Sequence, residues 1–195
     1  MKKLFLALLV FAVVCGAVFA DFDILSYPSS IEGGDIQIDL GLGYAGWGSY
    51  SGWKMKLPPI VLTGEYCLPV GVPISVGGMF SVARYGWDWS DYSYSNAHKI
   101  TYTYLIFAAR GNWHWGFDIN WLDLYTGLSF GYRHFSWSYD GPDKAYFDRY
   151  YSGWSYGGFY FGTQVGAHFY FTKFLGAAVE VGWPIYIKGA VALKF

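Results

Sequence analysis

The feature of this sequence that most limits its fold is an alternation of apolar with small or polar residues, which recurs along most of the chain. In the last run, from Ile185 to Phe195, every second residue forms an almost wholly apolar set: Ile, Ile, Gly, Val, Leu and Phe. The intervening positions hold a tyrosine, two alanines and the lysines Lys188 and Lys194. Successive side chains of a β-strand point to opposite faces. The pattern therefore predicts strands that each have one continuous apolar face.

The alternating runs and the turn residues between them predict eight strands. Their approximate ranges are 35–47, 55–68, 74–87, 98–111, 122–137, 154–171, 174–183 and 185–195. The connections after the first, third and fifth strands are longer and polar, whereas those after the second, fourth and sixth are short. The pair Pro58-Pro59 suits a rim or a bulge, because proline cannot donate to a central ladder. The fourth strand has no clean period, and its face assignment stays open.

The N-terminus has the pattern of a secretory signal peptide. Two lysines precede an apolar run from Leu4 to Phe19, and small residues lead to a cleavage site after Ala20. Cys15 leaves a lipoprotein as an alternative, although the residues before it make a poor lipobox. We expect residues 21–34, which are polar and end in Gly33-Gly34, to form a periplasmic lead-in. Residues 35–195 then form the one domain.

Composition indicates where such strands would lie. Aromatic residues make up 23% of the chain and charged residues only 14%, against about 25% charged in soluble domains. No apolar run after residue 20 reaches the ~20 residues that a membrane helix needs. The chain therefore fits an all-β, eight-stranded antiparallel transmembrane β-barrel in contact with the lipid of a bacterial outer membrane. A soluble β-sandwich is the alternative, but the second faces of these strands are mostly Gly, Ala and Ser and carry few charges.

Several classes of partner and cofactor lack support in the sequence. No basic patch points to a nucleic acid, and the four histidines are scattered over different strands without the spacing of metal ligands. No glycine-rich phosphate loop is present. Cys67 is the one cysteine left after cleavage, so an intrachain disulfide is excluded. We expect no metal and no cofactor.

The faces opposite the apolar ones carry side chains of both charges. The predicted lumen charge network consists of Asp39, Glu65, Asp123, Arg133, Glu180 and Lys188, with Lys194, Gln37, Gln164 and His168 on the same faces. Glu180 and Lys188 lie on adjacent strands and are expected to pair. Side chains roughly fill an eight-stranded barrel, so this network is predicted to plug the interior. A narrow pore for small solutes or ions is the alternative.

Two predicted loops, from Trp87 to Ala97 and from Trp137 to Gly157, are dense in Tyr, Trp, Ser, Gly and Asp. Binding surfaces often have this composition, because rigid aromatic rings give contact area while small polar residues adapt. The candidate ligand-binding residues are Trp87, Trp89, Tyr92, Tyr94, Trp137, Tyr139, Tyr146, Tyr150 and Trp154. They would contact a host or environmental surface ligand. The alternative is that these loops only cover the mouth of the barrel.

The stretch from Gly166 to Gly182 resembles the penultimate hairpin of small outer-membrane β-barrel families, of the OmpX, OmpA-barrel and opacity-protein type. In those proteins a strand ends in Tyr-Phe-Thr, and the next strand carries a Gly…Glu-x-Gly pattern with the glutamate inward. Phe195 is similar to the terminal residue that the barrel-assembly machinery reads. The resemblance implies a non-enzymatic protein of structural or adhesin-like role, although some members are small pores and a few are enzymes.

One short motif favours a third hypothesis, a lipid A-modifying hydrolase. His134-Phe-Ser136 is similar to the His-x-Ser of the lipid A deacylase barrels, in which an acid completes a triad. Here Asp148 would be the acid. The chain departs from that family directly after the serine, where it reads Trp-Ser-Tyr-Asp instead of Asn-Ala-Gly. We therefore predict a protein without enzymatic activity.

Overall fold

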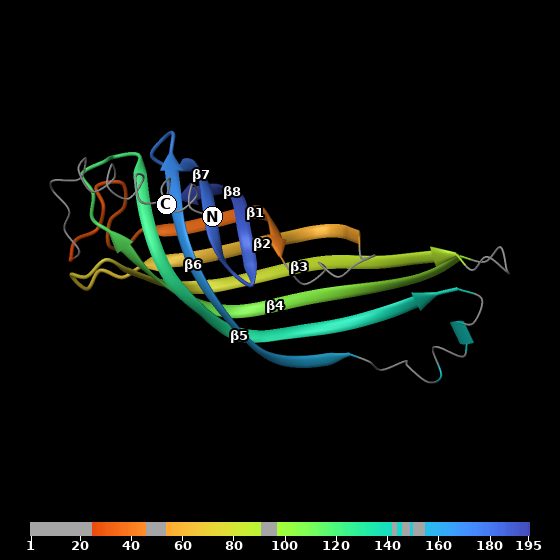
Figure 1. Ribbon diagram of the computed structural model, residues 1–195. Coiled ribbons are helices and arrows are strands. Elements are labelled where there is room, and N and C mark those ends of the chain that lie inside the picture. Colours follow the sequence, from red (N-terminus) through yellow and green to blue (C-terminus); the bar gives the residue numbers. More distant parts are fainter. Residues whose placement is uncertain (1–24, 46–53, 91–96, 142–143, 146–148, 150–154) are drawn as a thin grey trace, which may run out of the picture.

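The computed structural model describes residues 25–45, 54–90, 97–141, 144–145, 149 and 155–195, and these form a closed antiparallel β-barrel. The strands are β1 (Ile36–Ala45), β2 (Lys54–Cys67), β3 (Ile74–Ser90), β4 (Ala97–Trp115), β5 (Leu122–Asp140), β6 (Tyr156–Tyr170), β7 (Leu175–Trp183) and β8 (Ile185–Lys194). Each strand pairs with the next in chain order, and β1 pairs with β8 to close the barrel (Figure 1). The predicted eight-stranded barrel is confirmed. In the described part of the chain no helix is long and apolar enough to cross a membrane.

The alternation in the sequence becomes an inner and an outer face. On β1, Gln37 and Asp39 are buried inside, whereas Leu40 and Leu42 are each 57% exposed on the outside. The same division holds around the barrel, so the outer surface is a belt of exposed aliphatic and aromatic side chains. Among the most exposed are Leu40, Leu42, Phe107, Phe159, Val165, Phe171, Val191 and Phe195. Because the sheet is closed, every strand within this belt is paired on both sides and leaves no unpaired edge.

Irregular pairing changes the faces locally in two of the ladders. The β2–β3 ladder shifts between Met55 and Leu57 and again between Leu57 and Ile60, where the two prolines lack donors. The β1–β8 ladder shifts between Tyr44 and Ala45. This shift turns Ile185 into the barrel and leaves Tyr186 42% exposed outside, the reverse of the predicted faces. One irregular position in a ladder is enough to exchange the faces of the residues beyond it.

Strands β3, β4 and β5 continue far beyond the ends of β1, β7 and β8 (Figure 1). On β4 the outward positions from Leu105 to Trp115 are apolar or glycine, and those from Lys99 to Thr103 are polar. The eleven residues from Leu105 to Trp115 match the roughly 9–11 that a membrane-spanning strand needs. The eight residues before Leu105 add about 25 Å at ~3.3 Å per residue. We call this extension the arm; it consists of residues 83–90 of β3, 97–104 of β4 and 135–140 of β5, together with residues 54–57 of β2, which pair with β3 there. We call the opposite end of the barrel, with its short connections, the turn end.

The predicted strand boundaries at the arm and at the turn end need correction. The predicted loops at Trp87 and Trp137 begin too early, because β3 continues to Ser90 and β5 to Asp140. The predicted turn at residues 112–121 also begins too early, because β4 continues to Trp115. Aromatic and glycine-rich sequence is typical of both loops and strands, so composition alone did not locate these ends.

The inside of the barrel is layered. On the arm side lies a cluster of seven buried apolar side chains: Ala45, Val61, Met79, Ile106, Ala108, Tyr160 and Ile185. On the turn side, Ile31 from the N-terminal segment packs against Cys67 and Tyr170. Charged and polar side chains lie between these two apolar layers.

Candidate functional site

Eight ionisable side chains meet in the middle of the barrel, and each is at most 8% exposed. This charge cluster consists of Asp39 (β1), Glu65 (β2), Arg110 and His114 (β4), Asp123 (β5), His168 (β6), Glu180 (β7) and Lys188 (β8). Seven of the eight strands contribute to it. Each residue points inward because it occupies the inward parity of its strand, so the cluster is a direct product of the barrel register.

Arg110 is the central cation of the cluster. Its Nε lies 2.5 Å from Oε1 of Glu65, and its Nη2 donates to Oε2 of Glu180. Lys188 also approaches Glu180, with Nζ 3.2 Å from Oε2, and lies 3.5 Å from Asp39. The hydroxyl of Tyr125 donates to Glu180 at 2.9 Å. Charges removed from water are stable only when such contacts offset their lost hydration.

The two buried histidines connect the remaining carboxylates. In His168, Nδ1 lies 2.8 Å from Asp123 and Nε2 lies 3.2 Å from Asp39. Carboxylates only accept hydrogen bonds, so both ring nitrogens of His168 act as donors. His114 contacts the other oxygen of Asp123 through Nδ1 at 2.8 Å. Arg110, Lys188 and the two imidazole rings thus lie against all four carboxylates of the cluster.

Ser75, His114 and Asp123 resemble a Ser-His-Asp hydrolase triad in their contacts. Nε2 of His114 lies 2.9 Å from the hydroxyl oxygen of Ser75. However, that hydroxyl donates to Glu65 at 2.6 Å, which leaves its oxygen to accept from His114. A general base must instead accept the serine proton. Ser75 and His114 are also fully buried, so the arrangement links three strands and leaves no accessible nucleophile.

The structure brings together five of the six residues of the predicted charge network: Asp39, Glu65, Asp123, Glu180 and Lys188. The predicted contact between Glu180 and Lys188 is confirmed, and the two residues also pair across the β7–β8 ladder. Arg133 lies outside the charge cluster. It faces inward at the base of the arm, is exposed, and its Nη2 donates to the hydroxyl of Tyr156 at 3.3 Å.

Sequence reasoning missed the contribution of β4. Arg110, Asn112 and His114 all lie inside, and Asn112 donates to Glu65 at 2.5 Å. The predicted turn had removed Asn112 and His114 from the strand. The missed signal is that Arg110, Asn112 and His114 share one parity while Trp113 and Trp115 share the other.

The arm holds part of the predicted ligand-binding set. Trp87, on β3, is 41% exposed, whereas Tyr139, on β5, is only 3% exposed and contacts Nδ1 of His98 at 2.6 Å. Trp137 is half-buried on β5. Tyr92, Tyr94, Tyr146, Tyr150 and Trp154 lie outside the described residues, and of Trp89 only the backbone is described.

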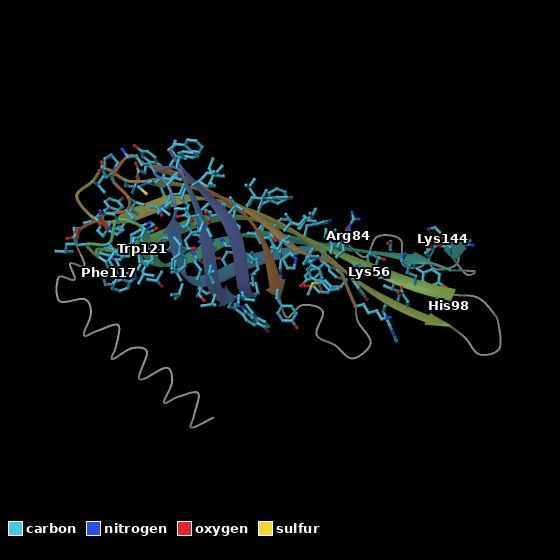
Figure 2. All side chains as sticks on the ribbon, turned by 90° about the horizontal axis from the view of Figure 1, so that it is seen from above. Lys56, Arg84, His98, Phe117, Trp121 and Lys144 are labelled. Atoms are coloured by element: carbon cyan, nitrogen blue, oxygen red, sulfur yellow. The ribbon has the colours of Figure 1, made fainter. Side chains whose placement is uncertain are left out.

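The two faces of the arm differ in chemistry. The face that continues the barrel interior carries packed aromatic rings: Tyr102 stacks on Phe135 with ring centroids 5.0 Å apart, and Tyr104 meets Phe135 edge-on at 5.1 Å. The other face carries an ion pair between Lys56 and Asp88 at 2.8 Å. The hydrogen bond from Lys56 lowers the pKa of Asp88. Figure 2 shows Lys56, Arg84, His98 and Lys144 along this extension, far from Phe117 and Trp121 at the turn end.

The residues of the hydrolase hypothesis do not form a site among the described residues. His134 and Ser136 lie on the outer face of β5, opposite Leu105 and Thr103, and no hydrogen bond joins them. Asp148 lies outside the described residues. In the same described ranges, no group of three or more His, Cys, Asp or Glu side chains is arranged to hold a metal ion.

Comparisons with known proteins find similarity at the level of the fold. No protein-family model and no curated protein sequence matches the chain. Among solved structures, the chain is similar to a de novo designed transmembrane β-barrel, with 12% identity and a TM-score of 0.49, covering 85% of this chain and 99% of the other. It is also similar to Ail, the attachment invasion locus protein of Yersinia pestis, crystallised with the heparin analogue sucrose octasulfate: 17% identity, TM-score 0.45, coverage 85% and 100%. The structure of Ail in a phospholipid nanodisc gives 16% identity, TM-score 0.41, and coverage of 83% and 99%.

Proposed function

We propose that this protein is an integral β-barrel of a bacterial outer membrane, closed to ions, which uses its arm to contact ligands outside the cell. The observation that carries the proposal is the combination of an apolar outer belt with a packed interior, in which each buried carboxylate contacts a cation or an imidazole ring. A soluble barrel would need the reverse arrangement, with an apolar core and a polar surface. A barrel in lipid must place its apolar side chains outward and satisfy its polar groups within.

The aromatic residues at both ends of the belt support contact with outer-membrane lipid. Near the arm end, the ring of Tyr186 lies 6.3 Å from that of Tyr44 and 5.6 Å from that of Trp183. At the turn end, Trp121 stacks on Phe169 at 6.2 Å, and both face outward. Rings with an apolar body and a polar atom are typical of the two membrane interfaces. A bilayer placed between these two groups covers the apolar belt.

The layered interior favours a closed barrel over the narrow pore. An ion crossing the lumen would meet an apolar layer on each side of the charge cluster, and apolar constrictions exclude water. The charges themselves are engaged with one another and offer no free ligand for a solute. Eight strands also leave little cross-section that side chains do not fill.

We expect the refolded mature protein to be silent in a planar lipid bilayer. The measurement is single-channel conductance, made on protein whose folded state is verified by its heat-dependent mobility in gel electrophoresis. We expect no conductance because the two apolar layers interrupt any continuous path of water through the barrel. Discrete and reproducible openings would instead support the pore and make the charge cluster its conducting site.

The arm is the surface that we propose for ligand contact. It extends about 25 Å beyond the spanning residues, and it carries Trp87 with 41% of its surface exposed. Trp and Tyr are enriched among the few interface residues whose truncation to alanine weakens binding by about 2 kcal/mol or more. This observation supports the adhesin-like role more than a purely structural one.

Replacing Trp87 with alanine should weaken ligand binding about tenfold or more, by the magnitude expected for an aromatic anchor. The parent protein in lipid vesicles would first be screened against immobilised glycans and matrix proteins, and the variant then measured on the surface that binds. Tyr66→Ala is the matched control, because Tyr66 is equally exposed (42%) but lies at the other end of the barrel. An equal loss of binding in the two variants, or no loss in either, would contradict the role of the arm in ligand contact.

Two finer parts of the proposal concern chemistry and assembly. We infer that the protein is not an enzyme, since the Ser75 hydroxyl is engaged by Glu65 and both His134 and Ser136 face outward. We also propose that the assembly machinery reads Phe195. Its side chain is 66% exposed, and its backbone pairs with Ile36 at the seam that closes the barrel. Normal assembly of a Phe195→Ser variant in cells would argue against this role.

A further inference from the structure

The segment before β1 is folded across the turn end of the barrel. Residues 27–31 belong to none of the eight strands, yet Pro28, Ser30 and Ile31 are buried. Ile31, which is 2% exposed, packs against Cys67 and Tyr170 inside the barrel. A lead-in that only connected a signal peptide to the first strand would have no reason to bury an isoleucine there.

The segment is tied to three separate parts of the turn end. The hydroxyl of Tyr27 lies within 3.0 Å of the carbonyl oxygen of Leu68 and 2.7 Å of that of Ile74, on either side of the β2–β3 turn. Burial, and next the neighbouring Cys67, raise the pKa of Tyr27 to about 12, so its hydroxyl keeps its proton.

Three further contacts hold Ser29 and Ser30. The backbone nitrogen of Ser29 donates to Phe117 at 3.1 Å, and the hydroxyl of Ser30 donates to Leu122 at 2.7 Å, both around the β4–β5 turn. Lys194, near the end of β8, donates to the carbonyl oxygen of Ser30. The contacts span the barrel mouth from β2 to β8, and the segment therefore crosses the opening.

The charge cluster lies next to this segment, on the side toward the barrel interior. The ring of Tyr27 lies 6.0 Å from that of His114, and His114 contacts Asp123. Gln37, which lies on β1 six residues after Ile31, contacts Asp123 at 3.3 Å and Tyr170 at 2.9 Å. On the arm side the cluster is already covered by the apolar layer that includes Ile106 and Ile185. Residues 27–31 thus separate the cluster from the turn end.

The barrel does not depend on the segment for its strand pairing. The ladders from β1 through β8 close without residues 27–31, and the bonds that extend the β1–β2 pairing toward the segment join Gly34 and Asp35 to Cys67. Gly34, between the segment and β1, has a φ of 108°, a conformation that favours glycine and that marks a sharp change of chain direction. The contacts that hold the segment are a few hydrogen bonds and the packing of Tyr27, Pro28 and Ile31.

We propose that residues 27–31 form a removable seal, which controls access from the turn end to the charge cluster of the barrel. With the seal in place the cluster is enclosed between two apolar layers. With the seal displaced, water and small solutes reach His114, Asp123 and Cys67 while the eight-stranded ladder stays intact. The proposal rests on the barrel and its interior, and it is independent of the ligand that the arm contacts.

Cys67 provides a built-in reporter of the seal. It is fully buried against Ile31, and it is the one cysteine of the processed chain, residues 21–195. The experiment compares the rate at which N-ethylmaleimide labels Cys67 in the refolded protein and in the double variant Tyr27→Ala/Ile31→Ala, which keeps the chain length. We expect labelling of the variant to be about tenfold faster or more, because the rate follows exposure of the thiol through local opening.

A second variant, which begins at Glu32, removes the seal completely. It should form the heat-modifiable barrel and label at least as fast as the double variant. Val70→Ala is the control, since Val70 is 61% exposed in the β2–β3 turn and does not cover the thiol; its labelling rate should equal that of the parent. Folded variants with labelling as slow as the parent would overturn the proposal. A shortened chain that cannot form the barrel would overturn it as well, because the segment would then be part of the fold.

Discussion

Replacing Arg110 with methionine is expected to destabilise the barrel by about 3–5 kcal/mol, the usual cost of removing one partner from a buried ion pair. Methionine fills a similar volume, so the loss comes from charge and not from a cavity. Glu65 and Glu180 would both lose their contact with the guanidinium, and both are buried inside the barrel. The measurement is unfolding by urea in lipid vesicles, followed by tryptophan fluorescence.

Two comparisons separate this explanation from a general effect of mutation. Arg133→Met removes an exposed arginine of the same inward orientation, and its effect should stay within about 0.5 kcal/mol. The double variant E65Q/R110M removes one carboxylate together with the cation, while Glu180 keeps its contact with Lys188. It should recover most of the stability lost in R110M, because neutral side chains can replace a buried ionic group at little net cost. An R110M protein as stable as the parent would contradict this explanation, because it would mean that water already hydrates the charge cluster.

Introducing arginine at Ala109 is expected to cost about 2–4 kcal/mol, the magnitude for a cation at the middle of the lipid-facing surface of a barrel. Ala109 is exposed on the outer face of β4, near the centre of the apolar stretch from Leu105 to Trp115. The substitution adds a side chain where nothing inside the barrel is touched. Its cost therefore measures the surrounding lipid and not the packing of the protein.

Thr101→Arg is the matched control for that substitution. Thr101 lies on the same strand and the same face, but in the arm, where the outward positions are polar. Arginine there should change the unfolding free energy by at most about 1 kcal/mol, as for positions near or beyond the interface. Both variants would be unfolded from the same vesicles. Similar costs at the two positions would contradict the placement of the membrane across residues 105–115.

Local pattern was sufficient for most of the fold. On β1, β6 and β7 the period of two runs without interruption, and the predicted faces of Asp39, His168 and Glu180 agree with their buried positions. The predicted strand ends were wrong where the residue types are similar on both sides of the end of a strand. Asn112 and His114 look like turn residues beside three tryptophans, yet they complete β4 and reach the charge cluster.

Other errors arose from contacts between distant segments. The face of Ile185 depends on an irregular pairing with Ala45, which lies 140 positions earlier in the chain. The role of Ile31 depends on Cys67 and Tyr170, which approach it only when the barrel closes. Neither position carries a local signal, because each residue would be equally acceptable in a loop or in a strand.

The sequence by itself determined the number of strands, their inner and outer faces and the polar character of the interior, because strand geometry ties each side chain to the parity of its position. Only the tertiary structure decided which charges meet, that Arg110 stands between Glu65 and Glu180, and that residues 27–31 cover the turn end. Those features follow from the registers that join β1 to β8 and from the closure of the ring. Closure brings together residues more than 100 positions apart, and the distances between them are fixed by all eight ladders together and not by any one segment.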